Sequence, residues 1–469
     1  MIDRLATRHH WLIYSAPILL LAVVSLLMRP PLPIDETRYL AVAWEMHLNG
    51  DWLVPHLNGR PYSQKPPLLF WLINAGWQVF GVNQWWPRLL PALAAIITLG
   101  LVQRISQRLG RSSPAPLLVG CLAWPLYSSV LLFDMLMAMF AALGWLGILR
   151  AGSQQRGGLT LIALALGLGI LCKGPVIFLY VLPFALITPT APPIGKWLLQ
   201  LLLATLAAAA IALAWALPAA NLGGQSYGDD LLWGQTAGRM RNSFSHQSPW
   251  WWYFPILMAL FLPWAWLPNF WRQLGRAWKE QQSRWLLLAF LIPFALFCLM
   301  SGKQPHYLLP LMPLVFVAIA GNQAKQSLSK SAFAIPVILS LTLIFLPSAQ
   351  LDPFRVETLA AKIHQLQQQN IPVLHAGKYH GDFHYLGRLE QRIHVRKDVR
   401  KIPAWVAEYK RGYLLTTDRH AERSDYVTAA MLENAEYVQP YRSGKIYLLP
   451  VAHEPAPPSA ATTRQRAEH

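Results

Sequence analysis

Long apolar segments separated by short polar loops fill most of the first 349 residues of the chain. Residues 11–28 contain no charged side chain and are long enough to cross about 30 Å of hydrocarbon as one helix. Further apolar segments follow at 88–103, 114–132, 134–149, 158–172, 175–189, 197–219, 250–271, 285–300, 307–321 and 331–349. The pattern predicts a polytopic α-helical membrane protein with about 11 or more transmembrane helices.

The first apolar segment also has a second interpretation. Arg4 and Arg8 precede it, as basic residues precede the apolar core of a signal peptide. No small-x-small cleavage site follows, whereas many more apolar segments do. We therefore expect residues 11–28 to be a retained helix.

Positive charges gather in alternate loops and predict the orientation of the chain. With the N-terminus in the cytoplasm, the inner loops hold 14 Lys or Arg residues, opposed by Asp3 and Glu280. These loops are 1–10, 104–113, 150–157, 190–196, 272–284 and 322–330. Such a bias favours this topology. The loops 29–87, 220–249 and 301–307, together with the tail from 350, then lie outside, and we expect the working face there.

The last part of the chain differs from the rest. Residues 356–369 are predicted as a helix, and 372–375, 412–416 and 445–451 as strands. We expect a transmembrane domain over 1–349, a small extracytoplasmic α/β domain over 350–452, and a disordered Pro/Ala/Thr-rich tail over 453–469.

Composition excludes several classes of protein. Of the 469 residues, 54% are hydrophobic and 13% are charged, which rules out a disordered chain and an ordinary cytosolic enzyme. The net charge of +18 could indicate a nucleic-acid partner. However, residues up to Gln350 hold 23 Lys/Arg against 9 Asp/Glu, largely in short loops, which is the pattern of charges that set topology. Cys121, Cys172 and Cys298 are far apart and imply neither a disulfide framework nor a metal site.

Acidic residues next to apolar segments are the first candidates for chemistry. Asp35 and Glu36 begin the first long outer loop, where a carboxylate could act as a general base, although an acidic pair also suits the start of a helix. Asp134 divides the apolar stretch 115–149 and would face the same side, unless it is only the polar tip of a hairpin.

Basic and aromatic residues of the outer loops are the second group of candidates for chemistry. Turns at Asn58-Gly59 and Pro66-Pro67 would hold Tyr62 and Lys65 at the head of an apolar segment, where Lys65 could bind a lipid phosphate or simply reach the interface. Arg241, or Arg239 beside it, could clamp a phosphate, or belong to a generic basic loop. Lys173 precedes Gly174-Pro175, and a turn explains that tripeptide.

These motifs, in this order, resemble the first periplasmic loop of ArnT-like enzymes. The matching residues are 35–39, 50–55 and 57–68, and the resemblance continues at 173–175, 246–264 and 301–310. ArnT-like enzymes are bacterial GT-C glycosyltransferases of the protein-mannosyltransferase superfamily. The resemblance implies a multi-pass protein of the bacterial inner membrane with a periplasmic active site. It further implies inverting transfer of a sugar from a polyprenyl phosphate, typically undecaprenyl phosphate, to a lipid A, glycan or protein acceptor.

The resemblance also implies roles for individual residues. Asp35 matches the catalytic acid, Glu36 is its immediate neighbour, and Asp134 matches the second acidic position; these three acids are the catalytic candidates. The positions near the donor phosphate are matched by Arg38, Tyr39, Tyr62, Lys65 and Arg241. Further candidates in the matching segments are Gln64, His246, Lys303 and Tyr307. Gln64 stands where the family often has Glu, which weakens a metal site. A divalent ion held by the acids is possible, but the resemblance requires no cofactor.

Two other classes of function remain open from the sequence. A transporter of lipids or lipid-linked sugars would place ionisable residues near the membrane midplane on broken helices, often in repeated halves. In this chain those residues fall on one face, and no internal repeat is visible. A non-catalytic receptor that binds a partner through its tail is the other alternative. No GxGxxG, P-loop, HExxH or CxxC motif points to a soluble nucleotide or zinc enzyme.

Overall fold

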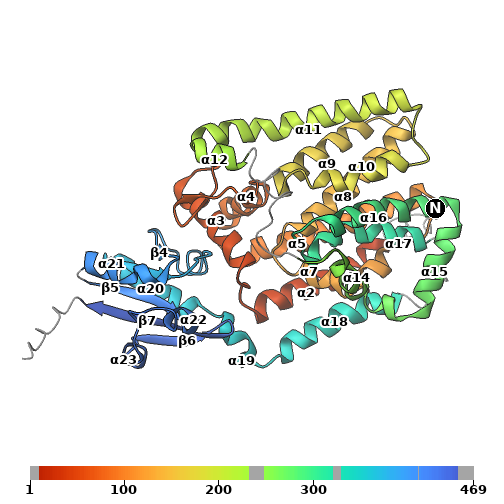
Figure 1. Cartoon of the computed structure of the whole chain (residues 1–469). Helices are drawn as coiled ribbons and strands as arrows, with labels where there is room; N and C mark the ends of the chain where they lie inside the picture. The colour runs from red at the N-terminus through yellow and green to blue at the C-terminus, as the bar shows by residue number, and fades with distance from the viewer. Residues whose placement is uncertain (1–9, 232–247, 321–328, 410, 453–469) are drawn as a thin grey trace, which may run out of the picture. The chain divides into compact units, whose positions relative to one another are not determined.

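The computed structural model describes residues 10–231, 248–320, 329–409 and 411–452. The chain divides into two compact units, Met1–Pro347 and Ser348–His469. The first unit is helical and the second contains a five-stranded sheet (Figure 1).

The first unit contains helices of very different lengths. Its α-helices are α2 (Ser15–Met28), α3 (Asp35–Asn49), α4 (Leu68–Phe80), α5 (Trp85–Arg108), α6 (Ala115–Val119), α7 (Ala123–Ser128), α8 (Asp134–Gly152), α9 (Gly158–Lys173), α10 (Ile177–Ile187), α11 (Ile194–Leu222), α12 (Gln225–Asp229), α14 (Tyr253–Leu260), α15 (Pro268–Lys279), α16 (Gln281–Leu299), α17 (Met312–Ala320) and α18 (Ser329–Phe345). The 3₁₀ helices are η1 (His10–Leu12), η3 (Trp250–Trp252), η4 (Trp264–Trp266) and η5 (Pro305–Leu311), and β1 (His56–Leu57) pairs with β2 (Arg60–Pro61).

The membrane character expected from the sequence is borne out by these helices. In the described residues, α5, α8, α11 and α16 are long and apolar enough to cross a membrane, and a fifth span results if one bent helix pair is counted. Shorter apolar helices occur at Ser15–Met28, Leu68–Phe80, Gly158–Lys173, Ile177–Ile187 and Pro305–Ala320. The first unit is therefore a helical membrane domain, with fewer full-length spans than the eleven segments in the hydropathy pattern.

Two of the expected continuous spans are broken in the structure. The segment 114–132 forms α6 and α7, and the segment 250–271 forms η3, α14, η4 and the start of α15. Pro263 and Pro268 lie where the second segment breaks, and proline removes a backbone donor and obstructs the preceding helical turn. Average hydropathy does not register these interruptions.

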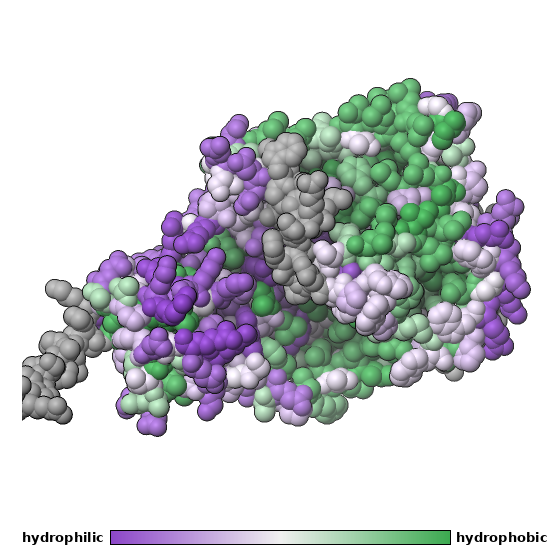
Figure 2. Space-filling model, viewed as in Figure 1, coloured by the Kyte–Doolittle hydropathy of each residue, from purple (hydrophilic) through white to green (hydrophobic). Residues whose placement is uncertain are grey.

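Helix α8 lies inside the first unit and positions much of the candidate site. It packs against α5, α9, α10 and η5, and most of its side chains are buried. The long helix α11 packs on α9 and leaves a row of leucines exposed, among them Leu198, Leu202, Leu206, Leu213 and Leu217. Figure 2 shows this hydrophobic surface over α11 and its neighbours. Exposed apolar rows on a membrane-length helix are suited to contact with lipid.

The second unit is built on a mixed sheet with strand order β4-β3-β5-β7-β6. Strand β3 runs parallel to β4 and β5, while β7 is antiparallel to β5 and β6. The strands are β3 (Val373–Ala376), β4 (His394–Arg396), β5 (Arg411–Thr417), β6 (Tyr437–Tyr441) and β7 (Gly444–Ala452). The helices are α19 (Ser348–Leu351), η6 (Asp352–Phe354), α20 (Glu357–Gln368), η7 (Val399–Lys401), α21 (Ile402–Glu408), α22 (Asp418–Ala421) and α23 (Ala429–Glu433).

The sheet has an apolar core on each face. Leu359 and Ile363 of α20 belong to one core, and Trp405 of α21 belongs to the other. The helix and three strands expected from the sequence are present as α20, β3, β5 and β7, within one or two residues. Strands β4 and β6 were not predicted, because β4 has only three residues and neither has a strong apolar pattern. The tail predicted to be disordered, 453–469, lies outside the described residues.

Candidate functional site

The two acids singled out from the sequence each begin a helix. Asp35 is the first residue of α3 and Asp134 is the first residue of α8. Negative charge at a helix N-terminus interacts favourably with the helix dipole. The two positions differ in exposure: the side chain of Asp35 is 42% exposed, whereas that of Asp134 is 2% exposed. Asp35 is therefore the acid that a substrate can reach.

Two neighbours on the same face of α3 hold the Asp35 carboxylate. Arg38 Nη2 donates to Asp35 Oδ1 at 2.7 Å, and the Tyr39 hydroxyl donates to the same oxygen at 3.1 Å. Residues three and four positions apart share a helix face, so both bonds follow from the sequence spacing. Burial, with the charge of Asp35, raises the pKa of Tyr39 well above its usual value, which keeps Tyr39 a neutral hydrogen-bond donor.

The first long loop brings Tyr62 and Gln64 to the same region. Arg38 Nη1 donates to Gln64 Oε1 at 3.3 Å, and the buried Tyr62 ring packs edge-on against Phe70. The loop is shaped by the Asn58-Gly59 turn, where both residues have positive φ and both backbone N–H groups donate to the Glu45 carboxylate. The turn expected from Asn-Gly is therefore present, and Glu45 anchors it.

Asp134 has a cationic partner that the sequence analysis assigned to a turn. Lys173, the last residue of α9, places its Nζ 2.5 Å from Asp134 Oδ1, and His306 Nε2 lies 3.8 Å from Asp134 Oδ2. Lys173 Nζ also lies 4.5 Å from the centre of the Tyr307 ring, a cation–π distance. The signal available in the sequence was that Asp134 and Lys173 are opposite charges that each interrupt an apolar stretch, since such groups are usually paired in a membrane protein.

The groups around Asp35 and Asp134 share one electrostatic environment. His306 interacts electrostatically with both acids and with Lys173 and Lys65. Tyr307 lies beside Lys173 and His306, and Lys65 interacts electrostatically with His306. Lys173 and His306 are residues near Asp134 that were not among the candidates from the sequence. Lys303, by contrast, is buried and donates to the carbonyl oxygens of Ser248 and Met300. The candidates Arg239, Arg241 and His246 lie outside the described residues.

Glu36, although adjacent to Asp35, points into a different environment. It is 1% exposed and forms an ion pair with Arg29, whose Nη2 also donates to Glu36 Oε1 at 3.1 Å. The backbone N–H groups of Leu32 and Leu131 donate to the two carboxylate oxygens, each at 2.7 Å. Burial acts to raise the pKa of Glu36, but Arg29, Arg88 and the Leu131 N–H overcome it and lower the pKa.

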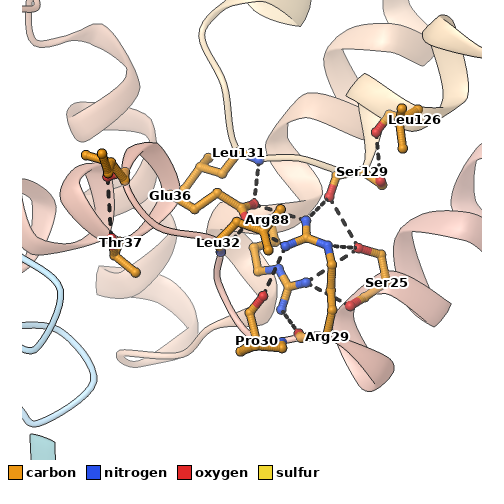
Figure 3. Close-up of polar contacts among 11 residues, drawn as sticks. Ser25, Arg29, Pro30, Leu32, Glu36, Thr37, Arg88, Leu126, Ser129 and Leu131 are labelled. Atoms are coloured by element: carbon orange, nitrogen blue, oxygen red, sulfur yellow. Dashed lines mark hydrogen bonds and ion pairs between the residues drawn. The ribbon is translucent and has the colours of Figure 1, made fainter. Parts of the chain in front are cut away.

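The contacts of Glu36 extend into a buried network between α2, α3, α5 and the segment before α8 (Figure 3). Arg29 Nη2 donates to the Ser129 carbonyl at 2.6 Å, and Arg88 donates to the carbonyls of Arg29 and Ser25 at 3.1 and 2.8 Å. Through Leu131 and Ser129, the network ties the start of α3 to the segment that leads into Asp134. Glu36 is therefore placed to hold both acid-bearing segments in position.

Within the described ranges, no group of three or more His, Cys, Asp or Glu side chains is arranged to hold a metal ion.

The chain is similar in sequence to known proteins. Residues 64–215 match the sequence model of the family described as dolichyl-phosphate-mannose-protein mannosyltransferase. A relative from Pseudomonas aeruginosa, named undecaprenyl phosphate-alpha-4-amino-4-deoxy-L-arabinose arabinosyl transferase, is 33% identical over 304 residues, which cover 60% of this chain and 54% of the relative. A relative of the same name, numbered 1, from Pseudomonas fluorescens is 30% identical over 330 residues, 65% of this chain and 57% of the relative. The chain thus spans little more than half the length of these curated relatives.

The fold has a counterpart among solved structures. The crystal structure of ArnT from Cupriavidus metallidurans in the apo state superposes with a TM-score of 0.74 at 17% identity, covering 94% of this chain and 97% of that one. The structure of the same protein bound to undecaprenyl phosphate gives 0.73 at 16% identity, covering 96% and 99%. Together, the sequence matches and the fold confirm the resemblance seen in the first-loop motifs: the chain is similar in sequence to this mannosyltransferase family and to the arabinosyl transferases, and it has the fold of ArnT.

Proposed function

We propose that the chain is an inverting glycosyltransferase that takes a sugar from a polyprenyl-phosphate donor, undecaprenyl phosphate in a bacterium. The observation that carries this proposal is the partly exposed Asp35 carboxylate, which accepts hydrogen bonds from Arg38 and Tyr39. His306 interacts electrostatically with Asp35 and with Lys65 and Lys173. The names of the relatives support the donor class. The acceptor is lipid A, another glycan or a protein.

The proposed chemistry is a single displacement at the anomeric carbon. An acceptor oxygen attacks that carbon, the bond from carbon to the phosphate oxygen breaks, and the electron pair remains on the leaving lipid phosphate. One displacement inverts the anomeric configuration and needs one base. For a hydroxyl acceptor, Asp35 accepts its proton; a phosphate acceptor is already ionised, and Asp35 then orients it.

The basic residues are proposed to stabilise the negative charge of the leaving phosphate. The leaving phosphate gains negative charge in the transition state, and in this proposal Arg38 and Lys65 stabilise that charge. Arg241 is proposed for the same task from the sequence resemblance alone. Asp134 is held by Lys173 and His306, so in this proposal it organises the site from the α8 side.

The topology proposed with this function has the site on the periplasmic side of the bacterial inner membrane, with about 11 spans and an extracytoplasmic second unit. The distribution of ionisable residues supports an enzyme over a transporter. Transporter sites lie near the membrane midplane, often in repeated halves. Here the acidic and basic candidates fall in segments predicted on one side of the membrane.

The direct test is mass spectrometry of the cell envelope from a deletion strain and from strains complemented with variants. Wild type and Asp229→Asn, which alters an exposed acid of α12, are expected to restore one defined sugar. Asp35→Asn, at equal membrane level, is expected to reduce the modification at least ~100-fold because the base is lost. Full restoration by Asp35→Asn would remove Asp35 from the reaction. An unchanged envelope in the deletion strain, with accumulated lipid-linked precursors, would indicate export instead of transfer.

A further inference from the structure

A basic hollow lies at the end of α8 that is remote from the candidate site. It has a volume of about 320 Å³ and is lined by Arg104, Gln107, Arg108, Leu146 and Arg150. Arg150 lies sixteen residues after Asp134 on the same helix, and the rise of an α-helix puts it about 24 Å away. The hollow is therefore separate from the site around Asp35 and Asp134.

Sequence spacing and helix packing explain why the three arginines converge. Arg104 and Arg108 are four residues apart and share one face of α5, and Leu146 and Arg150 do the same on α8. Helices α5 and α8 pack against each other, so the two faces meet at their C-terminal ends. Charges that only set topology need to be on one side of the membrane, and they do not need to line the same hollow.

Among the described residues, no acidic side chain pairs with the three guanidinium groups. No carboxylate lines the hollow, and in the part of the chain that the structure describes none of the three arginines forms an ion pair. Arg108 donates to the Gln155 side chain, and Arg150 Nη2 donates to the Arg156 carbonyl at 2.8 Å. Arg150 Nε is buried without a hydrogen-bond partner among the described atoms. Three like charges and a buried unpaired donor favour an anion in this position.

We propose that this hollow binds the phosphate head group of an anionic membrane lipid. Guanidinium groups match phosphate oxygens with two parallel hydrogen bonds, and basic pockets between membrane helices bind such head groups. The arginines stand in the last turns of two membrane-length helices, which is the level of lipid phosphates. Leu146 gives the hollow an apolar wall beside the acyl chains. The site is independent of the proposed transferase function.

The experiment uses the purified full chain in nanodiscs of phosphatidylcholine alone or with phosphatidylglycerol. Phosphatidylglycerol is expected to raise the melting temperature of wild type by about 3 °C, since a ligand that binds only the folded state stabilises it. Arg104→Gln/Arg150→Gln is expected to lose this increase and to retain less phosphatidylglycerol in native mass spectrometry. Arg272→Gln/Arg276→Gln removes the same charge from exposed positions of α15 and is expected to keep both.

Each other outcome overturns the proposal. An increase that survives in Arg104→Gln/Arg150→Gln places lipid binding elsewhere, and a loss in both double variants shows only a dependence on total charge. The same increase from inorganic phosphate in phosphatidylcholine nanodiscs, with no further effect of phosphatidylglycerol, assigns the site to a free anion. If the double variant does not fold, Arg104→Gln alone is measured in the same way, because Arg104 is exposed.

Discussion

At the residue scale, two adjacent acids in the same helical turn have different surroundings. Asp35 is partly exposed and accepts hydrogen bonds from two side chains of its own helix, whereas Glu36 is enclosed by Arg29 and two backbone donors. Consecutive residues of a helix point about 100° apart, so one side chain faces the loop while the next faces the helix bundle. The sequence analysis grouped Glu36 with the catalytic residues; the contacts favour a positioning role for it.

The first prediction at this scale concerns Glu36→Gln. The change leaves Arg29 buried without its counter-charge, and breaking a buried pair costs about 3–5 kcal/mol. We expect a clear fall in the melting temperature of the full chain in detergent, and a loss of transfer that parallels the loss of folded protein. Glu390→Gln, at an exposed acid of the second unit, is the control and should melt like wild type. Equal melting of Glu36→Gln and wild type would contradict the proposed role.

The second prediction concerns the Lys173–Asp134 pair. Lys173→Met leaves Asp134, which is 2% exposed, without its nearest cation, and we expect destabilisation of about 3 kcal/mol or more. In the double variant Asp134→Asn/Lys173→Met no unpaired charge remains, so its loss of stability should be smaller than the sum of the two single losses. The measurement is a double-mutant cycle on thermal unfolding. Additive effects would show that the pair is not coupled.

At the element scale, strand β3 carries a buried histidine in the second unit. Burial, above all, lowers the pKa of His375 and of His384 in the following loop to about 4 each, so both are neutral at pH 7. Their stabilising contribution is complete above the unfolded pKa of about 6.5 and is lost as pH falls toward 4. Each shift corresponds to about 3 kcal/mol.

The lowered pKa values of His375 and His384 predict that the second unit is sensitive to acid. Between pH 7 and 4.5, the protection factors of full-chain peptides covering 373–385 in hydrogen exchange should fall, once the slower intrinsic exchange at low pH is corrected for. His375→Phe should reduce that loss of protection, because it removes one titrating group. His364→Gln, which changes a histidine of α20 that contacts Gln368, is the control and should behave like wild type. An equal loss of protection in all three proteins would exclude His375 as a cause.

The elements also show which patterns are easy to predict. Helix α20 and strands β3, β5 and β7 were predicted because their apolar positions repeat with the period of a half-buried helix or strand. The breaks between α6 and α7, and around α14 and η4, were missed because apolar residues continue through them. In such segments, helix ends depend on proline positions and on packing, which a hydropathy average does not contain.

At the scale of the whole molecule, the proposed topology can be tested by labelling single introduced cysteines. The three native cysteines are buried, so they should add little background. Arg60→Cys, in the first long loop, should react with an impermeant thiol reagent in intact spheroplasts. Arg156→Cys, in the loop between α8 and α9, should react only after permeabilisation. Labelling of both positions from the same side would contradict the topology proposed from the basic loops.

The sequence by itself determined the membrane character, the basic loops and the order of the first-loop motifs. These are properties of single segments, because burial in lipid and turn formation depend on the residues of each segment. Only the tertiary structure decided which charges meet. Glu36 reaches the N–H of Leu131, 95 residues away, and Lys173 reaches Asp134, 39 residues away. Such pairs depend on how α2, α3, α8 and α9 pack in three dimensions, and no local pattern specifies that packing.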